Sequence, residues 1–394
     1  MGQTLVIAEK PSVAGDIARA LGGFKKDGDF WVSDAMIVGS AVGHLLEIKA
    51  PEEYDVKRGR WSFANLPVLP PHFDLQPIKK SIKKFEGLEK KIRSRSVTDI
   101  INACDAGREG ELIFRYIIQA TGTKKPIRRL WLQSMTKASI QKAFTALRSD
   151  AEMKPLEAAA RSRSEADWLV GINGTRALTA FNSKDGGFFL TTVGRVQTPT
   201  LAIVVAREEE ITHFKPQNYW EVHTTFGAQA GDYDSVWVDA DFKKTKGQSA
   251  ELKPERLWTA AEAQAIVAKC QGKLGIVTDH KRRATSAPPA LFDLTSLQRE
   301  ANGRFGFPAK MTLAILQRLY ERHKVLTYPR TDSRALPEDY PETMKETLSH
   351  LQKLEAYNAF AGQILMSGWV KGDNRRIFDN KKISDHFAIV PTGE

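Results

Sequence analysis

Carboxylate side chains follow two apolar runs that are typical of buried strands. Glu9 comes directly after the run Thr4–Ala8. Asp105, Glu109 and Glu111 come after the run Asp99–Cys104. The carboxyl ends of neighbouring parallel strands meet at one edge of an open α/β sheet, where such sheets bind ligands. Carboxylate oxygens there suit Mg²⁺, which binds through one or two carboxylates together with phosphate oxygens. A glutamate after a strand is by itself more often a surface turn residue. A metal site is favoured only because carboxylates follow two strands.

A tyrosine close to an arginine is the second candidate for chemistry. The segment 326–333 reads Leu-Thr-Tyr-Pro-Arg-Thr-Asp-Ser, which places Tyr328 two residues before Arg330. A phenol ionises in water only at about pH 10, so a tyrosine nucleophile needs nearby positive charge and a dry site. Arg330 is suited to bind a phosphate oxygen. The same segment also fits a strand end that enters an Asp-capped turn, with Tyr328 packed in a core.

The elements that position these residues follow from the spacing of apolar side chains. Thr4–Ala8 is expected to form a strand, and Ser12 to cap a helix that ends at the glycine pair 22–23. The same order of strand, polar loop and helix returns at Asp99–Cys104 and residues 105–117. Two such units predict an α/β sheet in the first part of the chain.

The remainder of the chain shows both helical and extended patterns. Residues 79–95 are expected to form a basic amphipathic helix on the outside of the sheet. Residues 155–210 read as helical, and residues 216–278 as β-rich. A domain boundary is predicted at 281–289, followed by a helix over 294–320.

The composition is that of a folded, basic protein. Of 394 residues, 42% are hydrophobic and 27% charged, which argues against global disorder and leaves room for two to four domains. Lys and Arg number 58 against 47 Asp and Glu, and the net charge of +11 is typical of a polyanion binder. Cys104 and Cys270 form no zinc motif or disulfide framework. No apolar run approaches the length of about 18 residues that a membrane span needs. We therefore expect a soluble, cytoplasmic protein.

Six segments resemble, in their order along the chain, the motifs of one family. Two carry the acidic residues, Ala8-Glu-Lys-Pro-Ser12 and Asp105-Ala-Gly-Arg-Glu-Gly-Glu111. The others are 166–177, 193–199, 326–333 and 384–392. The first two resemble the signature segments of the Toprim module. Together the six resemble the type IA DNA topoisomerases, specifically their bacterial topoisomerase III branch, and the resemblance spans essentially the whole chain.

The resemblance implies a catalytic role for five residues. Tyr328 is expected to attack a phosphate of single-stranded DNA and form a 5′-phosphotyrosine link, which stores the bond energy so that the strand is resealed without ATP. Arg330 is expected to stabilise the charged transition state, and Lys10 to protonate the leaving 3′-oxygen. His386 is expected to hydrogen-bond a phosphate, and Glu9 to act beside Lys10. Without the resemblance, Lys10 also fits an exposed partner of Glu9, and a lone histidine such as His386 is more often structural.

The resemblance also implies a metal site. Glu9, Asp105 and Glu109 are the implied ligands of Mg²⁺, which is needed mostly for religation. The Toprim pattern usually reads Asp-x-Asp-x-Glu, whereas Gly107 stands at the second Asp position of this chain. One oxygen ligand is therefore missing, and the number of metal ions stays open.

The fold implied by the resemblance is multidomain, of the α/β and α+β classes. A Rossmann-like Toprim domain is expected at 1–153, the first segment of a helical DNA-binding domain at 154–215, the first segment of a β-rich arch domain at 216–280, and a tyrosine-bearing helical domain at 281–394. In the family the chain then returns through the arch and helical domains to close a ring. The sequence ends before that return, so we expect an incomplete ring and a truncated or split family member.

Contacts to single-stranded DNA are expected along a cationic groove with aromatic platforms. Arginine, hydroxyl and amide groups suit phosphate and sugar contacts. Trp168, which has apolar neighbours in its helix, equally fits a core position. The expected DNA-contacting residues are Trp61, Trp168, Arg176, Thr192, Val193, Gly194, Arg195, Val196, Gln197 and Arg330.

The favoured function is a Mg²⁺-dependent, ATP-independent enzyme that cuts one DNA strand, passes another and reseals, relaxing negative supercoils or separating linked DNA. Its partners are expected to be single-stranded and negatively supercoiled DNA, with a helicase as a further candidate, and neither a membrane nor a nucleotide cofactor. The expected setting is a bacterial cytoplasm, on the nucleoid or a plasmid. Two alternatives remain. One is a non-catalytic single-strand DNA binder, and the other is a Toprim primase or nuclease, which would leave the Tyr328 segment without a role.

Overall fold

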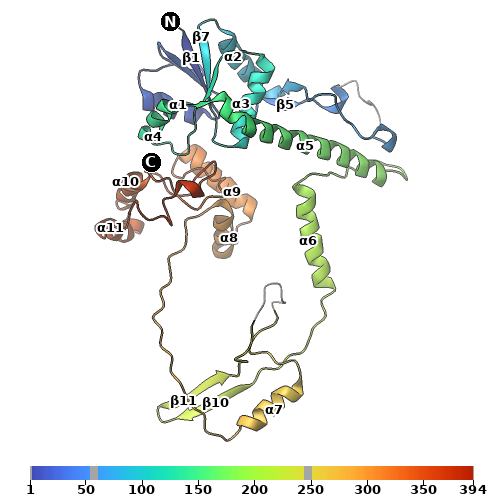
Figure 1. Ribbon diagram of the computed structural model, residues 1–394, viewed down its shortest axis with the longest axis vertical. Helices are drawn as coiled ribbons and strands as arrows, with labels where there is room; N and C mark the ends of the chain where they lie inside the picture. The colour runs from blue at the N-terminus through green and yellow to red at the C-terminus, as the bar shows by residue number, and fades with distance from the viewer. Residues whose placement is uncertain (1, 54–60, 244–250, 394) are drawn as a thin grey trace. The chain divides into compact units, whose positions relative to one another are not determined.

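A computed structural model describes residues 2–53, 61–243 and 251–393 (Figure 1). The chain divides into a large unit, Met1–Gln197 with Pro288–Glu394, and a small unit, Thr198–Ala287. The helices of the large unit are α1 (Pro11–Leu21), α2 (Ile82–Arg93), α3 (Arg108–Thr121), α4 (Lys137–Thr145), α5 (Asp150–Asn182), α8 (Leu294–Phe305), α9 (Ala309–Arg318), α10 (Pro341–Leu351) and α11 (Asn358–Met366).

The large unit is built on a seven-stranded sheet of order β2-β3-β4-β1-β7-β8-β9. Its centre is parallel, and its edge strands run antiparallel to their neighbours. A separate two-stranded sheet pairs β5 (Leu46–Ile48) with β6 (Leu75–Pro77). The seven strands are β2 (Lys25–Asp27), β3 (Phe30–Val32), β4 (Met36–Ser40), β1 (Gln3–Ala8), β7 (Val97–Ala103), β8 (Ile127–Arg129) and β9 (Arg148–Ser149).

The central strand β1 shows how the sheet is covered on both faces (Figure 1). Leu5 and Ile7 pack in a core with side chains of α2 and α3. Val6 and Ala8 pack on the other face with side chains of α1 and α4. All four are fully buried, as expected for a parallel strand covered on both sides. The predicted strands at Thr4–Ala8 and Asp99–Cys104, and the α/β class, are therefore confirmed.

The first helix begins two positions earlier than expected. α1 starts at Pro11, and its N-cap is Lys10, whose side chain makes no capping hydrogen bond. Proline suits the first helical position because it lacks the N–H that would be unpaired there. The prediction that Ser12 caps the helix was therefore wrong, and Lys10 is left with its ammonium free for another role.

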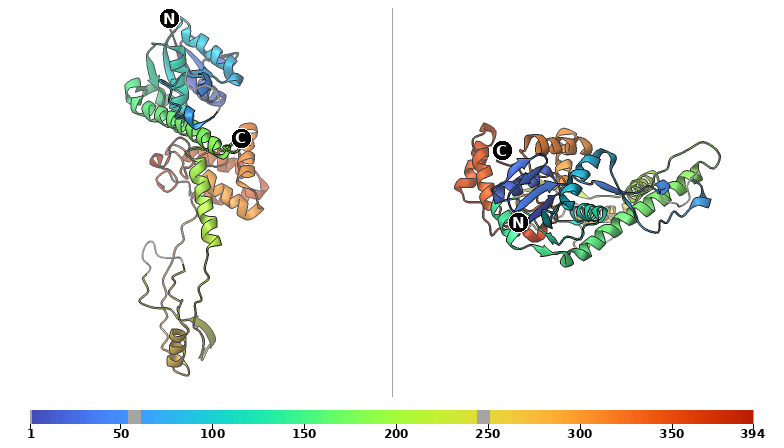
Figure 2. Two further views of the ribbon diagram at one scale, coloured as in Figure 1. Left: turned by 90° about the vertical axis from the view of Figure 1, so that its right-hand side faces the viewer. Right: turned by 90° about the horizontal axis from the view of Figure 1, so that it is seen from above.

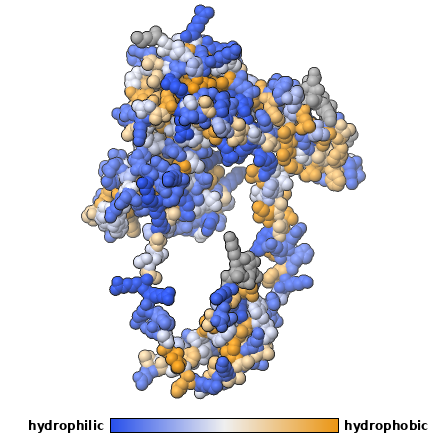
Figure 3. Space-filling model, in the orientation of Figure 1, coloured by the Kyte–Doolittle hydropathy of each residue, from blue (hydrophilic) through white to orange (hydrophobic). Residues whose placement is uncertain are grey.

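A long helix leaves the sheet domain, by which we mean the seven-stranded sheet with α1–α4. α5 spans 33 residues, about 50 Å, and runs as one continuous helix (Figure 2). It begins with a capping box in which Ser149 and Glu152 satisfy each other's backbone N–H groups. Apolar side chains gather on the surface over its C-terminal half (Figure 3), and they include Val170, Leu178 and Phe181.

Residues 288–394, which we call the tyrosine-bearing part, are mostly helical. The helix expected over 294–320 is in fact two, α8 and α9. Gly306 adopts a left-handed conformation (φ 67°) and Pro308 follows, so the first helix stops. A core of Leu336, Phe378, Ala388 and Val390 holds the irregular segments together.

The small unit contains a hairpin, β10 (His223–Ala228) with β11 (Gly231–Val236), and the helix α7 (Ala260–Cys270). α6 (Gln197–Thr212) leads into it. The expectation of a β-rich region over 216–278 missed α7. Its signal was the capping box formed by Thr259 and Glu262. None of the helices in the described ranges is both long and apolar enough to cross a membrane.

Candidate active site

The structure brings Tyr328 to the carboxyl end of the central strands. The ammonium of Lys10 lies 4.1 Å from the centre of the Tyr328 ring. The ring of His386 lies 4.2 Å from it, centre to centre, and the ring of Tyr320 lies 5.3 Å away. Lys10 follows β1, whereas the three rings belong to the tyrosine-bearing part. The side chains of two distant segments therefore share one site.

Backbone pairing explains why Tyr328 and His386 are neighbours. Thr327 donates from its backbone N–H to Val390 and from its hydroxyl to Ala388, both through carbonyl oxygens. The hydroxyl of Thr331 donates to the carbonyl of His386 at 2.9 Å. The segments 326–333 and 384–392 therefore run side by side, which places the phenol and the imidazole on the same side.

Two sets of hydrogen bonds join the tyrosine-bearing part to the sheet domain. The hydroxyls of Ser134, Thr136 and Ser139, at the start of α4, all donate to one carboxylate oxygen of Asp339. The amide of Gln133 donates to the carbonyls of residues 383 and 384. These contacts hold Asp339 and the start of the 384–392 segment against the sheet domain.

The acidic residues surround the lysine. Lys10 Nζ donates to Asp105 Oδ2 at 2.7 Å and lies 3.8 Å from Glu9 Oε1. Burial alone would raise the pKa of Asp105, but a hydrogen bond from His386 and the charge of Lys10 lower that pKa to about 2. Burial and the nearby Asp105 carboxylate raise the pKa of Glu9. Burial disfavours the charged form of Lys10, yet Asp105 outweighs it and raises the pKa of the ammonium. The site therefore holds an ionised aspartate and a protonated lysine.

A cavity of about 630 Å³ opens at this place. It is lined from the sheet domain by Lys10 and Asp105, and from the tyrosine-bearing part by Tyr328, His386 and Asp385. Tyr328 is half-buried and Lys10 is also partly exposed. The phenol therefore has a route to the solvent, which a tyrosine packed in a closed core would lack.

The other two predicted site residues lie apart from this cluster. Arg330 is exposed and donates from Nη2 (2.8 Å) and Nε (3.2 Å) to the side-chain oxygen of Gln317, with that amide oriented to accept. Glu109 is exposed, and its carboxylate lies 3.3 Å from His44 Nε2 and 3.9 Å from Arg163 Nη1. Neither residue contacts Tyr328 or Lys10 through an interaction among the described residues.

The carboxylates fit a hard divalent cation. Across the described ranges, no group of three or more His, Cys, Asp or Glu is already arranged to hold a metal ion. Mg²⁺, however, needs only one or two carboxylates with water and phosphate oxygens. Glu9 Oε2 is buried and has no hydrogen-bond partner in the described part of the chain. The ammonium of Lys10 already occupies a cation position beside Glu9 and Asp105.

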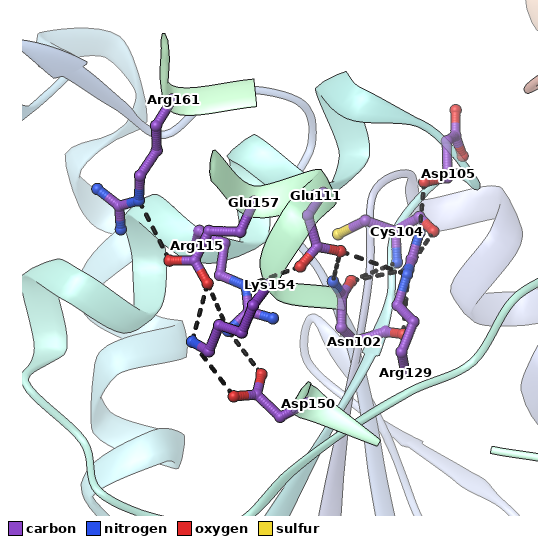
Figure 4. Close-up of polar contacts among 10 residues, drawn as sticks. All are labelled: Asn102, Cys104, Asp105, Glu111, Arg115, Arg129, Asp150, Lys154, Glu157 and Arg161. Atoms are coloured by element: carbon purple, nitrogen blue, oxygen red, sulfur yellow. Dashed lines mark hydrogen bonds and ion pairs between the residues drawn. The ribbon is translucent and has the colours of Figure 1, made fainter. Parts of the chain in front are cut away.

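A buried polar network fixes the strand end that carries Asp105 (Figure 4). The guanidinium of Arg129, 1% exposed, donates to the backbone carbonyls of Asn102, Cys104 and Asp105 at 3.1, 2.7 and 2.6 Å. Glu111 is fully buried, accepts a hydrogen bond from Asn102 and pairs with Arg115 at 2.7 Å. Glu111 therefore belongs to the core rather than to the strand-end carboxylates, where its spacing had placed it.

The predicted DNA-contacting residues lie mainly along α5 and the segment after it. Arg176 is buried, pairs with Glu52 and packs on the ring of Trp61. Trp168 is half-buried, and its indole N–H donates to a backbone carbonyl of residue 49. In the segment after α5, Thr192, Arg195, Val196 and Gln197 are exposed, whereas Val193 and Gly194 are partly buried.

In the exposed segment after α5, Arg195 pairs with Asp167 at 2.8 Å. The amide of Gln197 donates to the hydroxyl of Thr192. Val193 exchanges hydrogen bonds with the hydroxyl of Thr175 through its backbone.

Sequence reasoning missed three residues that shape this site. Tyr320 and Asp385 line the cavity, and Arg129 holds the backbone of Asp105. Asp385 could have been noticed because it directly precedes the histidine of a recognised motif. Tyr320 and Arg129 carry no comparable signal, since a helical tyrosine or an arginine after a strand is common in any protein.

Comparison with known proteins agrees with the fold. Residues 151–394 match the family described as DNA topoisomerase, and residues 4–135 match the Toprim domain. The full-length topoisomerase I of Thermotoga maritima shares the fold, with a TM-score of 0.54 at 23% identity, over 98% of this chain and 55% of that one. This chain belongs to the type IA DNA topoisomerase family, as the motifs predicted.

Its place within the family follows from curated relatives. DNA topoisomerase 3 of Bacillus licheniformis is 42% identical and that of Bacillus subtilis 41% identical, each over 396 aligned residues. Each alignment covers 100% of this chain and 51% of the relative. The chain is thus of the topoisomerase III branch, and it spans about half the length of the curated relatives it matches.

Proposed function

We propose that this chain carries the cleavage and religation centre of a type IA DNA topoisomerase, with Tyr328 as nucleophile. The observation that supports this most directly is the position of Tyr328 between Lys10 and His386 in a cavity that Asp105 also lines. A phosphodiester in that cavity would meet a phenol, an ammonium and an imidazole together.

In the proposed reaction the oxygen of Tyr328 attacks phosphorus, and the bond from phosphorus to the 3′-oxygen breaks. Lys10 protonates the leaving 3′-oxygen, and its pairing with Asp105 keeps it protonated for this step. The proton that the phenol of Tyr328 releases passes to Lys10, whose Nζ lies 4.1 Å from the centre of the Tyr328 ring, and replaces the proton that the lysine has given to the 3′-oxygen. Glu9, whose pKa is raised, lies beside Lys10 and is suited to relay this proton. Because the phosphotyrosine link preserves the bond energy, religation needs no ATP.

Hydrogen-bond donors at the site offset the charge that develops on the phosphate. His386 lies against Tyr328 and points Nε2 at Asp105, 3.3 Å away, so a phosphate beside the phenol comes within its reach. Arg330 would exchange its contact with Gln317 for a phosphate oxygen. Glu9 and Asp105 would hold Mg²⁺, and the bound ion would supply charge that favours religation. Glu109 would join them as a further ligand only by leaving its contact with His44.

The proposed substrate is single-stranded DNA, reached in negatively supercoiled or linked duplexes. The relatives named DNA topoisomerase 3 support DNA as the partner. The exposed segment around Arg195 and the aromatic pair of Trp61 and Phe188 support a path along α5. Strand passage, relaxation, decatenation, a helicase partner and a bacterial cytoplasmic setting belong to the same proposal.

A covalent adduct tests the nucleophile. The protein is incubated with a 5′-labelled or 3′-labelled single-stranded oligonucleotide, denatured with detergent, and resolved for labelled protein. We expect an adduct with the wild type that is lost in Tyr328→Phe and retained in Tyr340→Phe, because Tyr340 packs on Phe387 and is not among the residues that line the cavity. Only the fragment 3′ of the cut should stay attached, because the link is to a 5′-phosphate.

Tyr320 is the competing nucleophile, because its ring lies beside that of Tyr328. An adduct that survives Tyr328→Phe but disappears in Tyr320→Phe would move the chemistry to Tyr320. Absence of any adduct, with salt-dependent binding of the oligonucleotide intact, would favour the non-catalytic single-strand binder instead.

A further inference from the structure

Gly107 is not required by the backbone conformation of its position. It is the N-cap of α3, with φ −164° and ψ −176°, an extended conformation that any residue adopts. The residue is buried between Asp105 and the first turn of the helix. Its lack of a side chain therefore needs a different explanation, and space is the one that remains.

The space beside Gly107 is taken by a carboxyl group from the tyrosine-bearing part. A Cβ atom built on Gly107 would overlap both carboxylate oxygens and the carboxyl carbon of Asp385. A side chain at position 107 and the carboxylate of Asp385 are therefore mutually exclusive. An aspartate at 107 would start where the carboxylate of Asp385 now ends.

The backbone around Asp385 is fixed by hydrogen bonds, whereas its carboxylate has no partner among the described residues. The carbonyls of residues 383 and 384 accept hydrogen bonds from Gln133, and the carbonyl of His386 accepts one from Thr331, so the backbone on both sides of Asp385 is held. Within the described residues, the Asp385 carboxylate itself forms no hydrogen bond or ion pair. It lines the same cavity as Asp105 and Lys10.

We propose that Asp385 supplies the carboxylate that Gly107 lacks and so completes the divalent-cation site of Glu9 and Asp105. This inference rests on the proposed function, of which cation binding at those two residues is a part. Glu9 contributes a buried oxygen without a partner, and Asp385 contributes a carboxylate without a partner, from opposite parts of the chain. The cation site is then complete only while the tyrosine-bearing part lies on the sheet domain, and cation affinity is coupled to that contact.

Cation binding can be measured without the reaction. Mn²⁺, which carboxylate sites accept in place of Mg²⁺, is titrated into the full chain and the free ion is followed by electron paramagnetic resonance. We expect Asp385→Asn to weaken Mn²⁺ binding by about 10-fold or more, the range found when residues that support a metal site are removed. Asp332→Asn is the matched control. It removes one exposed carboxylate from the neighbouring segment, where Asp332 accepts a hydrogen bond from Ser384, and it should change binding less than about twofold.

A second experiment moves the carboxylate from position 385 to position 107. Gly107→Asp alone should lower the melting temperature, because its Cβ would overlap the carboxyl group of Asp385. Combining it with Asp385→Ala removes the overlap and returns a carboxylate to the site from the other side. We expect this double variant to recover both the melting temperature and Mn²⁺ binding to within about threefold of the wild type.

The outcomes separate this inference from the proposed function. Unchanged Mn²⁺ binding in Asp385→Asn would overturn the role of Asp385, and a fall in melting temperature alone would make it a structural partner of the α3 N-terminus. A wild type that binds no Mn²⁺ would also overturn it. Neither result touches the nucleophile, since the oligonucleotide adduct of Tyr328 is scored in a separate assay.

Discussion

Replacing Asp105 with asparagine should change the stability of the protein in a pH-dependent manner. In the folded chain the pKa of this carboxyl is lowered from 3.8 to about 2, because His386 and Lys10 outweigh the effect of burial. Asparagine keeps the size of the side chain but cannot ionise. The difference between the free energies of unfolding of the wild type and the variant therefore measures how much the ionised carboxylate stabilises the fold.

The magnitude follows from the lowered pKa. A difference of about 1.8 pH units corresponds to about 2.4 kcal/mol of stabilisation at neutral pH. Because the folded pKa is the lower one, this stabilisation is present above the unfolded value of 3.8 and is lost as the pH falls through about 2. At pH 3 roughly 1 kcal/mol of it should already be gone.

Urea unfolding of both proteins measures this difference. The unfolding of the sheet domain is the signal that is monitored, and the experiment is repeated at several pH values between 7 and 3. Asp16→Asn is the control, because burial raises the pKa of Asp16 and the sign reverses. The wild type should lose stability relative to Asp16→Asn as the pH rises through the range where that carboxyl ionises. A stability difference for Asp105→Asn that stays constant with pH would refute the reasoning, since only a neutral contact would then be lost.

Three further predictions concern the site and its support. Lys10→Met should slow formation of the oligonucleotide adduct by about 10²–10⁴-fold in single-turnover experiments, as loss of a general acid does, and an unchanged rate would remove Lys10 from the chemistry. Arg129→Met should destabilise the protein by about 3–5 kcal/mol in urea unfolding, because Glu111 loses a buried cation, and wild-type stability would contradict the role of the network. Arg195→Ala should reduce the slope of log affinity for single-stranded DNA against log salt by about 0.7, and an unchanged slope would place Arg195 away from the phosphates.

The sheet and its strand ends were predictable because local pattern decides them. A parallel strand buried on both faces reads as a near-continuous apolar run, and Leu5–Ala8 supply one regardless of what packs on either face. The polar residue that follows such a strand must lie at the sheet edge. Glu9 and Asp105 were placed correctly for this reason, whereas Glu111, in the first turn of α3, points into the core and pairs with Arg115.

The boundaries and the irregular regions were less predictable. The stop between α8 and α9 depends on one left-handed glycine, whose conformation the surrounding periodicity does not reveal. α7 was missed because the alternating pattern of the residues before it led to a prediction of β-structure for the whole region 216–278. The exposed apolar face of α5 was also not predictable, because a sequence pattern marks a helix face as apolar but does not say what packs on it.

The sequence by itself determined the α/β sheet, the positions of the acids at its edge and the membership of a family, because these depend on periodicity and on short motifs in order. Only the tertiary structure decided that Tyr328 lies over Lys10 and that Asp385 fills the place beside Gly107. Those contacts join segments separated by most of the chain. They arise from packing of the tyrosine-bearing part on the sheet domain, and no local preference of either segment specifies that packing.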